Sequence, residues 1–494
     1  MKLFKICFVS SEITPFAKTG GLADVSGALG KYLSKSGHDI RLVMPFYSSI
    51  DTKKYKIEPL KSAQNIILDF GSLEITFSIY HAVLPQSKAI VYFVHNPHFY
   101  TRAAIYTNDQ DEYLRFALLN RAALELCLIL EWQPDIFHCN DWQTGLIPVY
   151  LKTLYSQEKM LKRARCVHTI HNIGYQGVFN ADIIRQLSLE DYYQWFDADE
   201  LYRGSINYLR TGVLHADKIT TVSETYAREI LTDFYGEGLQ NTLNVRSKDL
   251  VGILNGVDYD EWSPESDPFI PYKFSIDNLT GKIKNKKKLL SGLGMSYDPN
   301  APVLSMITRL AEQKGIELLK GTMEKILNEF DIRFIVLGSG EHHYEQYFHY
   351  LQETYKNKVV FYLGYNFELS HLIEAGSDIF VMPSKYEPCG LNQIYSLKYG
   401  TVPVVRQTGG LADTVAFYDW KTQQGTGFIF DQYNSDSLYW ALQHAIRTFA
   451  DRKVWKKLML RGMKKDFSWD KQVKKYVELY ENTSKYKRII LNRA

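Results

Sequence analysis

Cysteine is scarce in this sequence, and its spacing is irregular. The 494 residues include five cysteines, at positions 7, 127, 139, 166 and 389, and none of them forms a Cys-x-x-Cys pair. A disulfide framework uses an even set of cysteines, and structural zinc needs closely spaced ligands. The sequence therefore predicts neither disulfides nor a metal site.

Long apolar runs are also missing. Nowhere do about 18 apolar residues follow one another, which is the length that a spanning helix requires. Residues 1–11 lack the apolar stretch and cleavage site of a signal peptide, and no transit peptide is visible. The longest candidate, residues 112–132, carries Arg115, Asn120, Arg121 and Glu125 at helical spacing, which predicts an amphipathic helix. We expect no membrane partner and a cytoplasmic protein, or one of the plastid stroma if the source is a plant.

An excess of one charge is absent as well. The 58 Lys and Arg residues against 55 Asp and Glu residues give a formal charge of +3, which does not favour nucleic acid as a partner. Aromatic residues, by contrast, are plentiful: 35 Tyr, 26 Phe and 8 Trp. They fit either large cores or flat faces that stack on sugars and bases, and composition alone leaves both interpretations open.

Short β-branched and aromatic runs alternate with helical patterns along the chain, as is typical of parallel sheets covered on both faces. Two such series predict an α/β protein with two Rossmann-like, doubly wound domains. The first series comprises residues 3–9, 40–44, 90–94, 136–139, 166–170 and 218–222, and the second 251–254, 303–307, 333–337, 359–363, 379–382 and 402–405. We place the N-terminal domain at 1–248, the C-terminal domain at 249–466 and a closing helix at 467–494.

Polar residues follow most of the predicted strands. Ligands of open parallel sheets bind at the carboxyl ends of the strands, so we expect these side chains to line one edge of each domain and a central cleft. Elsewhere, a basic stretch at Lys282, Lys284 and residues 286–288 predicts a solvated helix face.

A glycine pair lies between the first strand and the first helix, in Lys18-Thr19-Gly20-Gly21-Leu22-Ala23-Asp24. Two glycines at such a turn let backbone N–H groups approach an anion, and the helix dipole adds a favourable field. A plain tight turn would use the same glycines, but Lys18 favours the anion. The five residues from Gly20 to Asp24 recur as residues 409–413 in the second half.

Two cations, Arg309 and Lys314, follow a strand of the second half. Five residues apart in a strand-to-helix loop, both can point at a diphosphate and stabilise its departure. A solvated pair of loop cations is the alternative.

Glu387 follows another strand, directly before Pro388 and a helix start. Its carboxylate can accept hydrogen bonds from sugar hydroxyls, while residues 390–392 offer N–H groups to phosphate. A capping carboxylate is the alternative. Cys389 has no base near it in sequence, which favours a small buried group over a nucleophile.

His171 and Asp141 end two neighbouring predicted strands. A histidine at a strand end can bond a sugar hydroxyl or the reacting centre. Zinc is disfavoured, because His138 and Cys139 are adjacent and point to opposite faces of a strand.

Taken together, these motifs closely resemble those of bacterial glycogen synthases and plant starch synthases, which are retaining glucosyltransferases of the glycosyltransferase B-type fold. The resemblance runs essentially from end to end. It rests on Lys18–Val25, His171-Asn172 with Tyr175-Gln176-Gly177, Asn255–Asp258, Arg309 with Gln313-Lys314-Gly315, Glu387–Leu391, Thr408–Asp413 and the closing Phe467-Ser468-Trp469.

The resemblance implies an enzyme of glycogen or starch biosynthesis. Such a hexosyltransferase moves glucose from a nucleotide-glucose, usually ADP-glucose, to the non-reducing end of an α-1,4-glucan such as glycogen or a malto-oligosaccharide, without a cofactor. The implied catalytic residues are Asp141, His171, Arg309, Lys314 and Glu387. The implied substrate-binding residues are Lys18, Gly20, Gly21, Asp24, Asn255, Gln313, Tyr365, Cys389, Gly390, Leu391 and Asn392.

The resemblance also implies individual roles. Arg309 and Lys314 hold the diphosphate, and Lys18 approaches it from the N-terminal domain with the Gly20 and Gly21 amides. Glu387 binds the donor glucose hydroxyls, with Gly390, Leu391 and Asn392 at a helix start facing phosphate. Tyr365 stacks on adenine, and Asn255 and Gln313 make secondary contacts. Asp141 and His171 line the sugar site, and the closing helix crosses back onto the N-terminal domain.

Retention of configuration leaves two mechanisms open, namely front-face attack and a covalent intermediate on Glu387. The sequence departs from the family pattern after Trp142, where many relatives have a second histidine and this chain has Gln143. Residues 100–106 match the family only loosely.

Other functions remain as alternatives. The same fold could use UDP-glucose or a small soluble acceptor, or could be a silent glucan-binding relative, although the intact set of candidate residues disfavours the silent protein. A dinucleotide-dependent dehydrogenase is disfavoured, since the Gly-x-Gly-x-x-Gly loop is missing.

Overall fold

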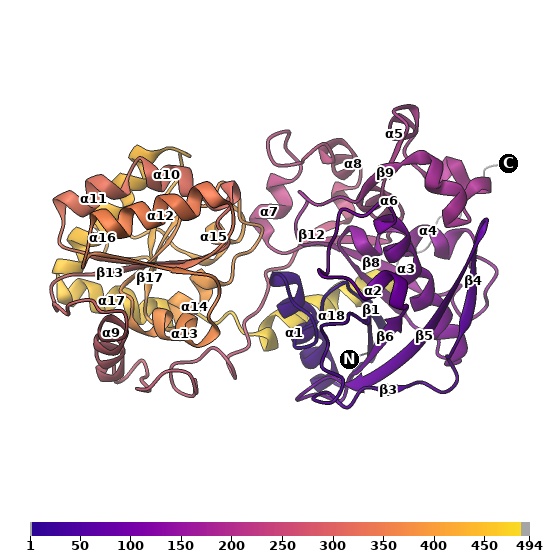
Figure 1. Cartoon of the computed structure of the whole chain (residues 1–494), viewed down its shortest axis with the longest axis horizontal. Coiled ribbons are helices and arrows are strands. Elements are labelled where there is room, and N and C mark those ends of the chain that lie inside the picture. The colour runs from indigo at the N-terminus through magenta and orange to yellow at the C-terminus, as the bar shows by residue number, and fades with distance from the viewer. Residues whose placement is uncertain (1, 486–494) are drawn as a thin grey trace. The chain divides into compact units, whose positions relative to one another are not determined.

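The computed structural model describes residues 2–485, which form two units (Figure 1). The first unit contains residues 2–222, 227–253 and 469–485, and the second contains residues 223–226 and 254–468. Each unit has its own sheet.

The first unit is built on a ten-stranded sheet in the order β12-β11-β8-β7-β1-β2-β6-β5-β3, with β4 paired to β5. Neighbours from β12 to β6 are parallel, whereas β5 runs antiparallel to β6, β3 and β4. The strands are β1 (Lys5–Val9), β2 (Asp39–Pro45), β3 (Glu58–Pro59), β4 (Ile66–Phe70), β5 (Leu73–Val83), β6 (Ile90–His95), β7 (Ile136–Asn140), β8 (Arg165–Ile170), β11 (Lys218–Thr221) and β12 (Leu250–Gly252). A separate antiparallel pair consists of β9 (Val178–Asn180) and β10 (Ser205–Asn207).

The helices of the first unit connect these strands. They are α1 (Gly21–Lys35), α2 (Pro97–Tyr100), α3 (Glu112–Ile129), α4 (Ile147–Lys152), α5 (Ala198–Tyr202), α6 (Tyr208–His215), α8 (Gln240–Val245) and α18 (Trp469–Lys485), with 3-10 turns at Trp142–Thr144, Ala181–Leu187, Glu190–Trp195 and Ser247–Asp249. Helix α7 (Glu224–Glu229) contains residues of both units.

The strand expected at residues 251–254 belongs to the first sheet, not to the second. As β12, it pairs in parallel with β11, so the division between the units falls after Ile253 rather than after residue 248. The antiparallel strands β3 to β5 and the pair β9 and β10 are additions that the alternating pattern did not predict.

Helix α3 corrects the expected amphipathic helix. Fourteen of its 18 residues are buried, and these include Arg115, Asn120 and Arg121, which have partners instead of facing water. Arg115 Nε donates to the carbonyl oxygen of Phe99 at 2.8 Å, and Asn120 Nδ2 donates to that of Gln143 at 2.6 Å. These partners come from other segments, so helical spacing could not show them.

The C-terminal helix α18 packs in the first unit against α1 and β8. The Tyr480 hydroxyl lies 2.7 Å from Nδ1 of His138, whose Nε2 lies 2.7 Å from the hydroxyl of Thr169. His138 therefore holds this helix. Residues 486–494 of the predicted closing helix lie outside the described residues.

The second unit contains a six-stranded parallel sheet in the order β15-β14-β13-β16-β17-β18. Its strands are β13 (Val303–Ile307), β14 (Arg333–Gly338), β15 (Val359–Leu363), β16 (Ile379–Met382), β17 (Val402–Arg406) and β18 (Phe428–Phe430). Its helices are α9 (Thr280–Gly292), α10 (Ile316–Lys320), α11 (Met323–Glu329), α12 (His342–Thr354), α13 (Phe367–Gly376), α14 (Asn392–Lys398), α15 (Gly409–Thr414), α16 (Ser435–Ala450) and α17 (Arg452–Met463), with a 3-10 turn at Glu312–Lys314.

Apolar side chains cover both faces of this sheet, because successive strand residues point to opposite sides. Leu304 and Met306 face a core formed with α10, α11, α12 and α16, whereas Val303 faces one formed with α9 and α13. Figure 1 shows α10 to α12 on one side and α9, α13 and α14 on the other. The carboxyl edge is thus left to the loops.

The basic stretch on α9 is only partly solvated, contrary to the sequence-based expectation. Lys282 and Lys286 are buried. Lys282 Nζ donates to Thr401 Oγ1 at 2.8 Å, and Lys286 Nζ lies 2.7 Å from Asp378 Oδ2. Distant segments supply these partners.

Two further observations concern the described part of the chain. None of its helices has the length and apolarity that a membrane crossing requires. No cluster of three or more His, Cys, Asp or Glu side chains within residues 2–485 is arranged to hold a metal ion, and all five cysteines are free and buried.

Candidate active site

The candidate residues of the second unit lie at the carboxyl edge of its sheet. Arg309, Gln313 and Lys314 follow β13, and Glu387 follows β16. Because β13 and β16 are parallel neighbours, their loops leave the sheet at the same edge.

Lys314 and Glu387 form an ion pair at the centre of this edge. Lys314 Nζ lies 2.7 Å from Glu387 Oε2, and Ser384 Oγ donates to the same oxygen at 3.0 Å. The two side chains are only 17% and 8% exposed, so each neutralises a partly desolvated partner. Within the described residues, no hydrogen bond is made to Glu387 Oε1, which leaves this oxygen to accept one from a ligand.

Two glycines of α15 support the backbone that carries Glu387. The Gly410 N–H donates to the carbonyl oxygen of Glu387 at 3.1 Å. A Cβ on Gly409 would lie 1.9 Å from that oxygen, and one on Gly410 would lie 2.1 Å from the carbonyl oxygen of Cys389. Gly409 also has a φ of +43°. Only glycine fits this close approach without strain.

Side-chain amides of Asn392 and Gln393 hold the loop after Glu387 by hydrogen bonds to backbone carbonyl oxygens. Gly390 has a φ of +68°, and Gln393 Nε2 donates to the carbonyl oxygens of Cys389 and Gly390, each at 3.0 Å. Asn392 Nδ2 donates to the carbonyl oxygen of Ile307 at the end of β13, at 2.8 Å. Leu391 precedes α14, which begins at Asn392. Gln393 was not among the sequence candidates, because an amide inside a helix gives no local signal.

Gln313 joins the two loops of this edge. Its Nε2 donates to the carbonyl oxygen of Tyr386 at 3.3 Å, and its carbonyl oxygen accepts from the Lys385 N–H at 2.8 Å. Gln313 therefore fixes the spacing of the loops that carry Lys314 and Glu387.

Arg309 and Tyr365 are exposed at the same edge. Tyr365 is 67% exposed and follows β15 after Gly364, whose φ is +106°. Arg309 follows β13 and is also exposed. Both side chains can meet a ligand without displacing a core residue.

Asn255 and Cys389 are buried together beneath this loop. Burial raises the pKa of the Cys389 thiol to about 12, against weaker opposing hydrogen bonds from Asn255. The thiol therefore stays protonated and is no nucleophile at neutral pH. Asn255 Oδ1 is buried with no hydrogen-bond partner among the described residues.

In the first unit, the glycine loop is tied to a buried carboxylate that the sequence did not single out. Glu12 accepts hydrogen bonds from the N–H and hydroxyl of Thr19 and, at 3.3 Å, from the N–H of Gly20. The Tyr106 hydroxyl also donates to Glu12. The Gly20 amide, expected to face an anionic ligand, thus faces Glu12 in this structure. Glu12 lies within an ordinary-looking run, Ser10 to Ile13, that carries no local motif.

Lys18 and Asp24 form an exposed pair beside this loop, with Nζ and Oδ1 2.8 Å apart. A Cβ added to Gly20 or Gly21 would meet no atom within 4 Å. The space beside both α-carbons is therefore open, unlike that beside Gly409 and Gly410, although the Gly20 N–H is bonded to Glu12.

Asp141 and His171 meet at the carboxyl ends of β7 and β8. Asp141 Oδ1 accepts from the N–H groups of His171 and Asn172 at 2.6 and 3.4 Å, and the φ of Asp141 is +53°. Burial raises the pKa of Asp141 to about 7. An unusual backbone angle and a shifted carboxyl are typical of a functional position.

The His171 ring is buried and lies against Asn140, with Nε2 2.9 Å from Oδ1. Burial, with a smaller contribution from His168, lowers the pKa of His171 to about 3. The imidazole is therefore neutral at pH 7. His138 is no part of this group, since both of its nitrogens bond Tyr480 and Thr169.

Parallel sheets in both units, with cations and a carboxylate at the edge of the second sheet, are the arrangement expected of a glycosyltransferase with two Rossmann-like units. Comparison with known proteins agrees with this class. The family described as "Starch synthase catalytic domain" matches residues 5–245, and "Glycosyl transferases group 1" matches residues 297–457. The chain belongs to the glycogen synthase and starch synthase family.

Its similarity to individual relatives extends over nearly the whole chain. The glycogen synthase of Thermosipho melanesiensis is 42% identical over 486 residues, which cover 98% of this chain and 100% of the relative. That of Thermotoga maritima is 44% identical over 481 residues, covering 97% and 98%.

Solved structures confirm the glycosyltransferase B-type fold. The catalytic domain of starch synthase IV from Arabidopsis thaliana, bound to ADP and acarbose, matches with a TM-score of 0.91 and 34% identity, covering 98% of this chain and 100% of that chain. Sucrose-phosphate synthase from Thermosynechococcus elongatus matches with a TM-score of 0.61 at 15% identity, covering 97% and 98%, and supports the fold alone.

Proposed function

We propose that this chain transfers glucose from ADP-glucose to the non-reducing end of an α-1,4-glucan with retention of configuration. The observation that carries the proposal is its similarity, over nearly its full length, to proteins named glycogen synthase. The ADP and acarbose of the starch synthase structure are a nucleoside diphosphate and an oligosaccharide analogue, which supports the same two substrate classes.

The edge of the second sheet supplies the groups for donor departure. As the bond between the anomeric carbon and the phosphate oxygen breaks, negative charge develops on the diphosphate. Lys314 and the exposed Arg309 stabilise that charge, and Glu387 Oε1 accepts a hydrogen bond from a glucose hydroxyl. Tyr365 supplies an exposed ring for the adenine, and the loop at Gly390, Leu391 and Asn392 supplies N–H groups for phosphate.

The first unit supplies neutral and open groups. His171, uncharged at pH 7, bonds a hydroxyl close to the reacting carbon without donating a proton to the leaving group. Lys18 approaches the phosphates, with Asp24 orienting Lys18, and Gly20 and Gly21 carry no side chain that would block this approach. Asp141 fixes the backbone that carries His171.

We further infer a cytoplasmic location. The support is the five free, buried cysteines, since reducing compartments keep thiols unpaired.

Labelled ADP-glucose and UDP-glucose, each incubated with no acceptor, with glycogen and with small soluble sugars, test the proposal. We expect label to enter polymer from ADP-glucose only when glycogen is present. Label in a small product would show that the acceptor is a soluble sugar instead of a glucan. A preference for UDP-glucose would show that the donor is not ADP-glucose. Absence of transfer under every condition would favour the alternative function, a glucan-binding protein without catalytic activity.

A further inference from the structure

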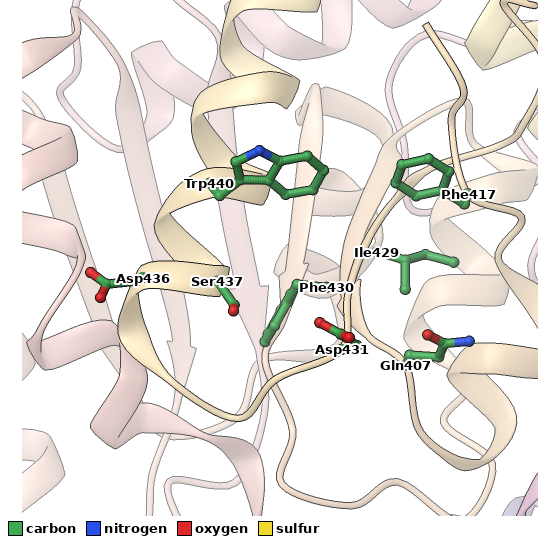
Figure 2. Close-up of a pocket in the computed structure, with 8 residues that line it drawn as sticks. All are labelled: Gln407, Phe417, Ile429, Phe430, Asp431, Asp436, Ser437 and Trp440. Carbon is green, nitrogen blue, oxygen red and sulfur yellow. The ribbon is translucent and has the colours of Figure 1, made fainter.

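A pocket of about 550 Å³ opens in the second unit (Figure 2), and none of its lining residues is among the candidate residues described above. It lies where β17 and β18 end, next to the first turns of α16. Since β16, β17 and β18 are parallel neighbours, the pocket follows Glu387 along the same carboxyl edge of the sheet.

Two exposed aromatic rings form one wall of the pocket. Phe417 and Trp440 are 48% and 43% exposed, their planes differ by 7°, and their centroids are 6.5 Å apart. Figure 2 shows the rings next to each other, with Ile429 and Phe430 of β18 beneath them. The two partly exposed rings thus lie nearly parallel at the same pocket.

The chain holds Phe417 in this position through its backbone. Phe417 forms a bridge with Gly427, and a Cβ on Gly425 would lie 2.3 Å from the carbonyl oxygen of Phe417. Trp440 is fixed on α16, whose N-cap Asn434 accepts from the Ser437 N–H at 2.8 Å. Both rings are among the exposed large apolar side chains of the described residues, so neither is a buried core residue.

Hydrogen-bonding groups surround the two rings. Asp431, Asp436, Gln407 and Ser437 line the pocket, and all four belong to the loops or helix start at this edge. The two carboxylates accept hydrogen bonds from hydroxyls, and they repel phosphate and other anions. A ring face carries partial negative charge, which attracts the C–H groups on the flat side of a pyranose.

We propose that this pocket is a second, non-catalytic binding site for an α-glucan chain, with successive sugars resting on Trp440 and Phe417. The inference rests on the proposed function, which supplies the class of polymer. A chain held at this edge is retained near the transfer site between catalytic events. The expected consequence is higher affinity for long glucans, with no change in the chemical step.

Variants of the two rings test the site. Trp440→Ala combined with Phe417→Ala should reduce retention by glycogen in native affinity gels by about tenfold, since each ring contributes a stacking contact. The KM for glycogen should rise similarly, while kcat with maltotriose stays within about twofold of the unaltered chain. Tyr350→Ala, which removes another exposed ring of the same unit, is the matched control and should change neither value.

Three outcomes would overturn the inference. The first is unchanged retention of the double variant by glycogen, and the second is an equal loss of retention in the Tyr350 control. The third concerns β-cyclodextrin, a cyclic α-glucan used as a probe of the pocket: its displacement by adenosine but not by maltoheptaose. Because folding of the double variant could fail, Asp431→Ala provides a second test and should also weaken retention. Retention requires no donor, so the gel separates failure of this site from failure of the proposed glucosyl transfer.

Discussion

The sequence Gly-Gly-Leu-Ala-Asp occurs once in each unit, and the two copies do different things. In the first unit, Gly20 and Gly21 have open space where a Cβ would be. In the second, Gly409 and Gly410 press against the carbonyl oxygens of Glu387 and Cys389. A side chain added at the first pair would thus meet no neighbour, whereas the second pair supports the backbone that carries Glu387.

The aspartates of the two copies differ in the same way. Asp24 pairs with Lys18 at the exposed edge of its loop. Asp413 accepts from the N–H and hydroxyl of Thr225, at 2.9 and 2.6 Å, and so fixes the start of α7. The motif therefore predicts the position of a turn, but the role of the turn depends on the residues that contact it.

The largest effect is expected at the second copy. Gly409→Ala combines a positive φ with a contact that the backbone must relieve, so we expect a loss of about 3 kcal/mol in the free energy of unfolding and the displacement of Glu387. Urea denaturation measures the stability, and glucosyl transfer measures the displacement. A variant as stable as the unaltered chain would show that this copy is not structural.

Removal of a cation at the same edge should affect rate without affecting stability. Arg309→Ala is expected to lower glucosyl transfer by about 10²-fold, because one positive charge opposite the leaving diphosphate is lost. The melting temperature should stay unchanged, since the side chain is exposed. Lys320→Ala, a surface cation on α10, is the control; equal rates in both variants would remove Arg309 from the site.

Acid should destabilise the first unit at a higher pH than the second. Burial lowers the pKa of His138, His168 and His171 in the first unit to about 3, from 6.5 in an unfolded chain. A lowered pKa gives stability that is complete above pH 6.5 and is lost as the pH falls toward 3.

The second unit has a buried histidine with a charged partner. His371 lies 2.9 Å from Asp267, whose pKa is below 3.8 because hydrogen bonds from His371 and Tyr399 outweigh its burial. That contribution is present above pH 3.8 and is lost only in stronger acid. Hydrogen exchange between pH 7 and 4.5 should therefore rise earlier in β7 and β8 than in β13 and β16, and the reverse order would contradict this assignment.

A moderate effect is expected at the first copy. Gly20→Ala and Gly21→Ala should leave the free energy of unfolding within about 0.5 kcal/mol, because the added Cβ meets nothing. Glucosyl transfer should fall about tenfold if the donor approaches this backbone. Gly292→Ala, also in open space, is the matched control. Full activity in the loop variants would make the first copy a plain turn.

The smallest effect is expected from the aspartates. Asp24→Asn should change stability by no more than ~0.5 kcal/mol, since the pair with Lys18 is exposed. Asp413→Asn should cost about 1 kcal/mol, because it weakens two hydrogen bonds that hold α7. Equal melting temperatures of the two variants would contradict this difference between the roles of Asp24 and Asp413.

The parallel core of both sheets could be predicted from sequence, because buried parallel strands are continuous apolar runs. The rest depended on distant partners. Strand β12 has three residues and gains its place by pairing with β11, and β3 to β5 form an antiparallel edge that no helix separates. Lys282 is buried because carbonyl oxygens and Thr401 from other segments surround its ammonium group.

The candidate site was predictable where a motif follows a strand. Lys314 and Glu387 are 73 residues apart, yet their strands are neighbours, so the sheet topology brings them together. Glu12 and Gln393 could not be predicted, since each acts by hydrogen bonding to the backbone of a loop and neither belongs to a recognisable motif. Burial explains most of the aromatic excess, whereas the exposed rings of Phe417, Trp440 and Tyr365 are the candidates for stacking on a ligand.

The most direct test of the account is the rate at which Glu387→Gln transfers label from ADP-glucose to glycogen. We predict that the unaltered chain incorporates label and that the variant does so at least about 10²-fold more slowly, because the charged acceptor for a glucose hydroxyl is lost. An equal rate in the two proteins, or no incorporation by the unaltered chain, would contradict it.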